Sequence, residues 1–323
     1  MLTSQLHATT EILPVAGLDR LAEHLPTAWV ENALAATGSA SIRRRRLPAE
    51  QVVWLIIALA LYRRQSMPEV LATLDLALPS VTAAPVSKSA VTQARQRLGA
   101  APLEWLFAQT AQAWCRQDAE RYTWHGLSLW AMDGTTFRTP DSADNRAHFG
   151  AQSYVSGKVA SYPQVRAVSV TALPTHLVAD MAFGEYGQNE MQYAKALVGR
   201  IADHSLTVFD RGFLSAEILL GLTMSGQARH YLIPAKSNTK WEVLSGTADD
   251  CLVRMRVSPQ ARAKAPDLPE HWTTRAVRMV STSGKQRILL TSLLDRRRFK
   301  PEALAECYRR RWEIETSYRE LKQ

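Results

Sequence analysis

Hydrophobic positions in the first 120 residues follow helical spacing. An apolar run from Val52 to Leu61 comes directly after Pro48, and proline is favoured in the first turn of a helix. Further helices are predicted near 68–76, from Ser87 or Ser89 to Gly99, and from Pro102 onward. Since no strand pattern interrupts them, we predict an all-α N-terminal domain over residues 1–120.

From about residue 127 the pattern changes to short apolar runs that are typical of strands. Strands are predicted at 127–133, 164–173, 177–183 and 205–210, and helices at 190–201 and 215–222. Four further strand-like runs lie at 230–234, 251–257, 272–280 and 287–294, and one last helix is predicted from Pro301 to the end. We therefore predict an α/β domain over 121–323, with a β-rich segment at about 229–294.

The composition is that of a globular protein with a basic surface. Hydrophobic residues make up 46% of the 323 residues and charged residues 21%, which excludes a wholly disordered chain. Lysine and arginine number 39 against 30 acidic residues, so the net charge is +9, which favours a polyanionic partner without requiring one. Two interpretations of Arg43–Arg46 stay open: a solvated linker or a phosphate contact.

Several classes of protein are disfavoured. Three scattered cysteines with no C-x-x-C, and histidines with no H-E-x-x-H, argue against a disulfide framework and a zinc site. The N-terminus lacks the pattern of a secretory signal. The run from Val52 to Leu61 is about half of the ~20 residues that a membrane span needs. We expect a cytoplasmic protein without membrane contact.

Two predicted strands end in an aspartate, Asp133 and Asp210, and each is followed by glycine within two residues. A single aspartate after a strand is commonly a turn or capping residue. Two of them in one βββαβα unit favour a catalytic site at the edge of the sheet, because α/β folds place their sites there. Other acids are interpreted as turn or capping residues: Asp141, Asp144, Glu185 and Glu190.

The last predicted helix carries polar residues on one face. Tyr308, Arg311, Glu315 and Lys322 are separated by 3, 4 and 7 positions. At about 100° per residue they fall within a stripe of about 60°. Glu313 and Glu320 lie outside this stripe. The alternative is a solvated face with an ordinary Arg311–Glu315 pair, which contributes only a few tenths of a kcal/mol.

Together these motifs resemble the IS4-type DDE transposases of bacterial insertion sequences. The resemblance rests on Asp133-Gly-Thr, on Val208-Phe-Asp-Arg-Gly-Phe213, and on the Y-R-E-K spacing of Tyr308, Arg311, Glu315 and Lys322. The segment from Arg43 to Gly99 also resembles the N-terminal domain of these transposases, which implies that the helical residues 1–120 bind DNA. The resemblance therefore covers nearly the whole chain.

The resemblance implies an RNase H-like mixed-sheet catalytic core with a β-rich insertion. Asp133 would lie on its first strand, Asp210 on its fourth, and Glu315 on the helix after the insertion. These three carboxylates would be both the catalytic residues and the ligands of two Mg²⁺ ions, for which Mn²⁺ would substitute. The expected reaction is cleavage at transposon ends and joining of the 3′-OH to target DNA.

The resemblance also implies the partners. Double-stranded DNA, as terminal inverted repeats and as target, would be contacted by Tyr308, Arg311 and Lys322 beside the scissile phosphate. Lys236 and Lys240 would line the DNA channel or serve only solubility, and Trp241 would stack on a flipped base or pack in the core. A homodimer in the synaptic complex and association with the nucleoid are expected.

One departure from the family pattern leaves a second function open. The sequence stops at Gln323, one residue after Lys322, whereas family members continue. The alternative is therefore a truncated, weakly active or inactive DNA-binding fragment that occupies transposon ends. A non-transposase nuclease of the same fold is the third class, but it gives no reason for the full Y-R-E-K stripe.

Overall fold

The computed structural model describes residues 21, 23–40, 47–73, 86–153, 157, 160, 162–280, 284 and 286–322. The chain forms two compact units, residues 1–110 and 111–323. The boundary falls inside helix α7 (Ala101–Arg121), whereas the sequence pattern placed it at residue 120. Arg43–Arg46 lie outside the described residues, so their role stays a prediction.

The first unit is helical, as predicted. Its described helices are α3 (Thr27–Ala36), α4 (Ala49–Leu61), α5 (Met67–Thr73), α6 (Lys88–Leu98) and the start of α7. The Ser87 side chain caps α6 by accepting a hydrogen bond from Ala90 N, and Gly99 ends it with φ 71°. Apolar side chains from these helices form one core around Val53 and Leu55, which are fully buried.

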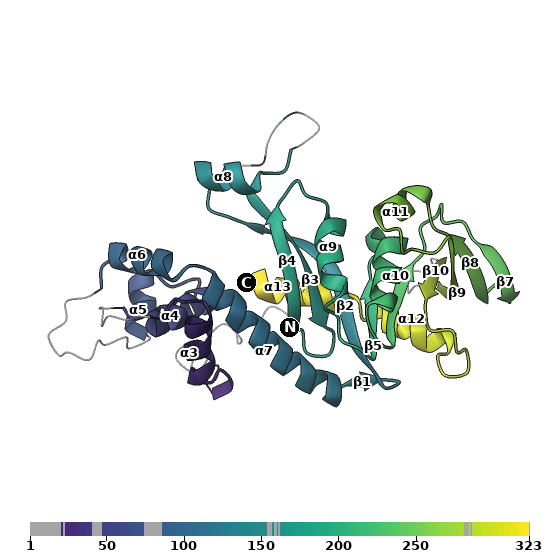
Figure 1. The fold of residues 1–323 in the computed structure, drawn as a ribbon, viewed down its shortest axis with the longest axis horizontal. Helices are drawn as coiled ribbons and strands as arrows, with labels where there is room; N and C mark the ends of the chain where they lie inside the picture. Colours follow the sequence, from purple (N-terminus) through teal and green to yellow (C-terminus); the bar gives the residue numbers. More distant parts are fainter. Residues whose placement is uncertain are drawn as a thin grey trace. The chain divides into compact units, whose positions relative to one another are not determined.

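The second unit is built on one large mixed sheet (Figure 1). Its first five strands in space are β4-β3-β2-β5-β6, in which β2 pairs antiparallel with β3 and parallel with β5. They are β2 (Leu127–Arg138), β3 (Gln164–Ala172), β4 (Val178–Glu185), β5 (Ser205–Phe209) and β6 (Arg229–Pro234). This arrangement, with its first strand beside its fourth, confirms the RNase H-like core expected from the sequence.

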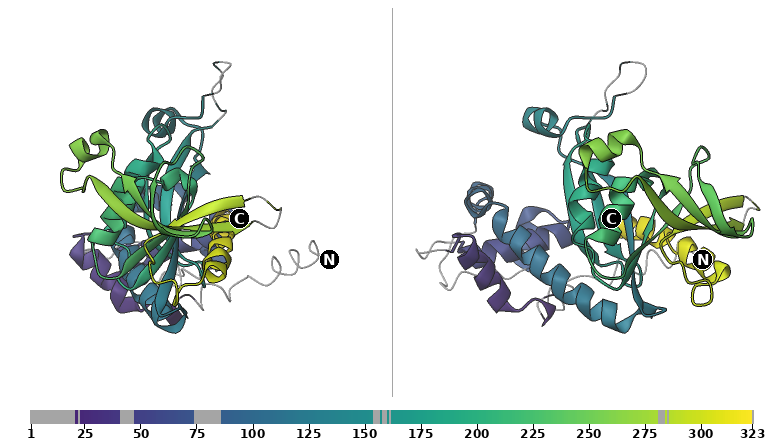
Figure 2. Two further views of the ribbon diagram at one scale, coloured as in Figure 1. Left: turned by 90° about the vertical axis from the view of Figure 1, so that its right-hand side faces the viewer. Right: turned by 45° about the vertical axis from the view of Figure 1, so that its right-hand side comes forward.

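Helices cover both faces of this core (Figures 1 and 2). One face packs against α9 (Glu190–Val198) and α10 (Ala216–Met224), the other against α12 (Pro301–Arg309) and α13 (Trp312–Lys322). Alternate residues of β2 divide between the two cores, because successive side chains of a strand point to opposite faces. Trp130 and Met132 belong to the first core, and Leu129 and Ala131 to the second.

The β-rich segment extends the same sheet instead of forming a separate one. Beyond β6 the sheet continues as β10-β9-β8-β7. These strands are β7 (Glu242–Gly246), β8 (Asp250–Arg256), β9 (His271–Val280) and β10 (Gln286–Thr291), with α11 (Pro259–Lys264) between β8 and β9. The sequence pattern missed β7 because all five of its residues are exposed, so it lacks an apolar row. It also grouped β6 with this segment, whereas β6 pairs parallel with β5.

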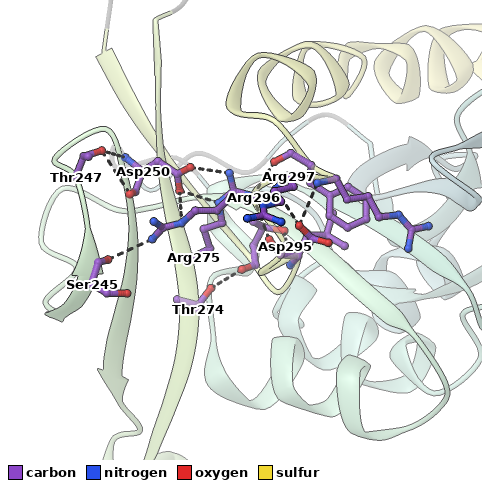
Figure 3. Close-up of polar contacts among 12 residues, drawn as sticks. Ser245, Thr247, Asp250, Thr274, Arg275, Asp295, Arg296 and Arg297 are labelled. Atoms are coloured by element: carbon purple, nitrogen blue, oxygen red, sulfur yellow. Dashed lines mark hydrogen bonds and ion pairs between the residues drawn. The ribbon is translucent and has the colours of Figure 1, made fainter.

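Arg275 on β9 connects this extension to the start of α12 (Figure 3). Its side chain is fully buried and donates to both carboxylate oxygens of Asp250, at 2.7 and 2.8 Å. It also donates to the backbone oxygen of Phe299, at 2.7 Å. The loop that leads into α12 is therefore held by a strand of the extension.

Two predicted elements differ from the observed ones. The strand predicted to end at Asp133 continues to Arg138, because β3 pairs with it along its whole second half. The last helix is interrupted at Arg310–Arg311, where the amide of Arg311 donates to Tyr308 O and that of Ile314 to Arg311 O. These are three-residue turns, tighter than α-helical ones, so the chain divides into α12 and α13. Besides β7, the sequence pattern did not predict helices α3 and α11, the short strand β1 (Thr123–Trp124) or the helix α8 (Ala143–Phe149).

Candidate active site

The alternation of the strands places Asp133 and Asp210 on the same face. Asp133 continues the row of Leu129 and Ala131 on β2, and Asp210 continues the row of Leu206 and Val208 on β5. The parallel register pairs Met132 with Phe209, so the two aspartates follow the last paired residues. They therefore lie at the carboxyl end of neighbouring strands, on the face that α12 and α13 cover.

Asp133 is a half-buried carboxylate in an acidic surrounding. The amide of Gly134 donates to its Oδ1 at 2.8 Å, since β5 has ended and offers no ladder partner there. Burial raises the pKa of Asp133 to about 6, and the charges of Asp210 and Glu315 raise it too, against the lowering effect of Gly134 and Arg311. The ionised form of such a carboxyl group is stabilised by any cation that lies close to it.

Asp210 occupies the turn after β5. Its Oδ2 accepts a hydrogen bond from the amide of Gly212 at 3.2 Å and so caps the short 3-10 helix η1 (Arg211–Phe213). The capping role considered in the sequence analysis is therefore real. It occupies one oxygen and leaves the carboxylate close enough for its charge to act on Asp133.

Arg311 joins two of the predicted acids. Its Nη1 lies 3.1 Å from Asp133 Oδ2, and its Nη2 lies 3.2 Å from Glu315 Oε1. The arginine is only 8% exposed. Burial lowers the pKa of Arg311, but Tyr308 and the three carboxylates outweigh this effect, and the pKa is raised. The tight turn between α12 and α13 thus places one buried cation against the acidic cluster.

Tyr308 and Lys322 complete the stripe. Tyr308 is buried, and burial raises its pKa together with the charge of Asp210. Lys322 is exposed, and its Nζ donates to Thr135 Oγ1 at 2.6 Å, two residues beyond Asp133 on the same face of β2. The protein partly shields this amine from water, which lowers the pKa of Lys322. All six residues predicted for the site therefore gather around the ends of β2 and β5.

Two neighbours of the cluster were missed by the sequence analysis. The hydroxyl of Tyr318, on α13, donates to the backbone oxygen of Asp133 at 2.5 Å. Glu190 was interpreted as a capping residue and does begin α9, but its carboxylate also lies against Gly134. A methyl group on Gly134 would meet this carboxylate at 2.5–2.8 Å, which explains the glycine after Asp133. Neither contact has a signal in local sequence, because both join segments far apart in the chain.

Other candidates lie outside the cluster. Glu313 pairs with Arg310 at 2.8 Å, and Glu320 with His176 at 3.0 Å, in agreement with their place outside the stripe. Lys236 and Lys240 are exposed. Trp241 is partly buried against the α9/α10 core and lines a pocket of ≈330 Å³ in the β-rich segment. The roles considered for these last three residues stay predictions.

The donor chemistry of the cluster suits a hard divalent cation. Its oxygens come from three carboxylates, without a thiolate or an imidazole, and such ligands are typical of Mg²⁺ and Mn²⁺. Among the described residues, however, no three acids, histidines or cysteines converge closely enough to hold a metal ion. Instead, the guanidinium of Arg311 bridges Asp133 and Glu315.

Comparison with known proteins decides the family. Residues 15–108 match the family model described as insertion element 4 transposase N-terminal, and residues 124–323 match the transposase DDE domain. The chain is 38% identical over 307 residues to the transposase InsG for insertion sequence element IS4 of Escherichia coli K12. The chain belongs to the IS4-type DDE transposases. This confirms the resemblance drawn from the motifs, and with it a transposase that cuts and joins DNA.

The extent of each match is as follows. The alignment with InsG covers 95% of this chain and 69% of InsG. A second relative, the putative transposase InsZ of the same strain, is 38% identical over 237 residues, which is 72% of this chain and 77% of InsZ. Nothing in these matches favours the alternative of a DNA-binding fragment over the transposase.

A solved structure was also compared with this IS4-type transposase. It is the piggyBac transposase synaptic complex with hairpin DNA, at 10% identity and a TM-score of 0.36. The match covers 90% of this chain and 57% of that chain, and at this score it carries no argument. None of the described helices combines the length and the apolar character needed to cross a membrane.

Proposed function

We propose that Asp133, Asp210 and Glu315 are the catalytic carboxylates of this transposase. The observation that carries the proposal is the double contact of Arg311 with Asp133 and Glu315, beside Asp210. It supports a common role for three acids that lie far apart in the chain. Partly buried acids that gather around one cation at the carboxyl end of neighbouring strands are typical of a catalytic site.

The same three carboxylates would hold Mg²⁺, with Mn²⁺ as a substitute. When bound, a divalent ion supplies charge stabilisation on the scissile phosphate and lowers the pKa of the attacking water or 3′-OH. The chain's own contribution is a group of neighbouring carboxylates whose repulsion a cation relieves: burial, and then the charges of Asp210 and Glu315, raise the pKa of Asp133 to about 6. Asp210 is held by Gly212 and Glu315 by the helix α13, so two of the ligands are already anchored.

Arg311, Tyr308 and Lys322 would contact the phosphates beside the scissile bond. Both cations now bind protein oxygens, namely carboxylates for Arg311 and the Thr135 hydroxyl for Lys322. A phosphate is a competing acceptor of the same kind, and charged donors bind it strongly. Once released from the carboxylates, the guanidinium of Arg311 would hold the charge that develops on the phosphate.

The proposed substrate is double-stranded DNA, as the inverted repeats of the element and as the target. Cutting at the transposon end would free a 3′-OH, which would then attack the target strand at the same carboxylates. A homodimer would hold two ends together, and the activity would take place at the bacterial nucleoid. The net charge of +9 supports binding to a polyanion.

The test uses a labelled duplex that carries the inverted repeats flanking the chain's own gene. We expect Mn²⁺-dependent strand cutting by the unmodified chain and a loss of at least about a hundredfold in Asp133→Asn, Asp210→Asn and Glu315→Gln. The matched control is Glu313→Gln, which changes a carboxylate on the same helix that pairs with Arg310 instead. Cutting that survives in Glu315→Gln, or that is lost equally in Glu313→Gln, would contradict the assignment.

A further inference from the structure

Tyr318 is a buried tyrosine whose hydroxyl lies against the backbone of Asp133, beside the acidic cluster. It stands three residues after Glu315 on α13 and is 5% exposed. Its hydroxyl oxygen lies 2.5 Å from the backbone oxygen of Asp133 and 2.9 Å from Ser169 Oγ on β3. Ser169 is directly opposite Asp133 in the sheet register. One hydroxyl therefore connects the helix of Glu315 with the backbone of Asp133.

Counting protons fixes the direction of these hydrogen bonds. A backbone oxygen only accepts, so the single proton of Tyr318 is donated to Asp133 O. Ser169 must then donate to Tyr318, and its own oxygen accepts from Thr171, whose Oγ1 lies 3.1 Å away. Ser169 and Thr171 are fully buried. The result is a buried chain of three hydroxyl groups, each of which donates one hydrogen bond, and the last of these bonds goes to the backbone oxygen of Asp133.

Apart from Tyr318, the polar links that the structure shows between this helix and strand β2 depend on the two cations of the site. Arg311 contacts Asp133 and Glu315, and Lys322 contacts Thr135. Both cations are assigned to DNA phosphates in the proposed function, so these links are lost when DNA binds. The bond from Tyr318 uses no charge and faces no solvent, so it remains when the cations change partners.

We infer that Tyr318 is a positioning residue, which holds the helix of Glu315 at a fixed separation from Asp133 through its hydrogen bond to the Asp133 backbone. This inference rests on the proposed function, because it assumes that Asp133 and Glu315 act together. Partners that orient metal ligands without touching the metal typically change affinity or activity by 10- to 100-fold when removed. Tyr318 acts in this way on two ligands at once.

The test removes the hydroxyl alone. Tyr318→Phe keeps the ring and its packing, and the matched control is Tyr193→Phe. Tyr193 is also a buried tyrosine, on α9, whose hydroxyl donates to the backbone oxygen of Glu185 at 3.1 Å on the other side of the sheet. Mn²⁺ binding to the full chain without DNA is measured by electron paramagnetic resonance, and strand cutting is measured over a range of Mn²⁺ concentrations.

We expect Tyr318→Phe to weaken Mn²⁺ binding about tenfold and to raise the Mn²⁺ concentration for half-maximal cutting by the same factor. Tyr193→Phe should leave both unchanged. A purely structural defect would instead reduce the fraction of active protein without moving the half-maximal concentration. Ser169→Ala, which keeps the bond from Tyr318 to Asp133, should show a smaller shift of about two- to threefold.

Asp133→Asn, measured in parallel, separates the two proposals. If Asp133→Asn cuts as well as the unmodified chain, the proposed function is wrong and this inference falls with it. If Asp133→Asn is inactive and Tyr318→Phe matches Tyr193→Phe in Mn²⁺ affinity and in half-maximal concentration, the positioning role of Tyr318 is wrong and the proposed function stands.

Discussion

The guanidinium of Arg311 lies 3.1 Å from the carboxylate of Asp133, although 178 positions of the sequence separate the two residues. The arginine is nearly buried, and its other nitrogen reaches Glu315. A half-buried group of acids is unfavourable without a nearby cation, since burial penalises the charged forms. In this structure the chain supplies that cation itself.

Arg311→Gln is expected to destabilise the folded chain. Removing one partner of a buried ion pair leaves carboxylates without their cation, which we expect to lower the free energy of unfolding by about 1–3 kcal/mol at pH 8. The loss should be smaller at pH 5, because Asp133, with a pKa of about 6, is then largely neutral. Urea unfolding at both pH values measures it.

The control for this prediction is the neighbouring residue. Arg310→Gln breaks a more exposed pair with Glu313, in which the side chains are 35% and 33% exposed. Such a pair contributes at most about 1 kcal/mol. Equal losses in the two variants, or a loss in Arg311→Gln that does not depend on pH, would show that Arg311 does not neutralise the cluster.

Asp133→Asn should stabilise the metal-free chain above pH 6. Folding raises the pKa of Asp133 from its ordinary 3.8 to about 6, so the folded state binds the proton more tightly than the unfolded state. The contribution of protonated Asp133 to the free energy of unfolding is therefore fully present below about pH 4, and it is lost as pH rises through about 6. This change in pKa corresponds to a loss of about 2–3 kcal/mol of stability once Asp133 is ionised, and the neutral asparagine does not suffer this loss. Unfolding in the presence of a chelator should show the two proteins converging as pH falls from 6 to 4.

The alternation of side chains along the strands explains why part of the candidate site could be predicted from sequence. The rows Leu129–Ala131 and Leu206–Val208 are apolar up to the acids that follow them, and this local pattern identified Asp133 and Asp210. Spacing placed four residues of the last helices on one face, and the resemblance to the Y-R-E-K motif gave them their expected roles. Local patterns of this kind are reliable where one face of an element is buried, because burial then fixes which side chains share a face.

What the sequence could not predict depends on contacts between distant segments. The wheel at about 100° per residue assumes one continuous helix, but the turn at Arg310–Arg311 is tighter, and no glycine or proline marks it. The bond from Tyr318 to Asp133 spans 185 positions. All five residues of strand β7 are exposed, so no row of apolar residues marks it in the sequence. Its place in the sheet comes from its backbone pairing with β8.

Gly134→Ala tests the explanation for the glycine after Asp133. The new methyl group would meet the Glu190 carboxylate at 2.5–2.8 Å, which forces that side chain to move. Because the carboxylate is the end of a flexible side chain in a long ion pair with Arg166, at 3.5 Å, we expect a modest loss of about 1 kcal/mol. Glu190→Ala in the same chain should restore most of it. Thermal unfolding measures the stability of the single and double variants. If the losses of the two single variants add up in the double variant, the contact is not the cause.

Arg275→Ala should be the most damaging of the changes considered. The side chain is fully buried and donates to Asp250 (Figure 3). It also donates to Leu293 O and Phe299 O. Its removal leaves the partly buried carboxylate of Asp250 without its main cation and two backbone oxygens with fewer donors, which typically costs about 3–5 kcal/mol. Arg275→Lys should recover little of this loss, because one ammonium group cannot reproduce the planar set of donors. Urea unfolding of the full chain measures both variants.

The matched control for this prediction is Arg254→Ala, on the adjacent strand β8. Arg254 also pairs with an acid at 2.7 Å, but its side chain is 48% exposed and that of Glu242 is 59% exposed. Water replaces such a pair easily, so the expected loss is under about 1 kcal/mol. A loss in Arg275→Ala no larger than that in Arg254→Ala would mean that burial of Arg275 does not hold the start of α12 in place.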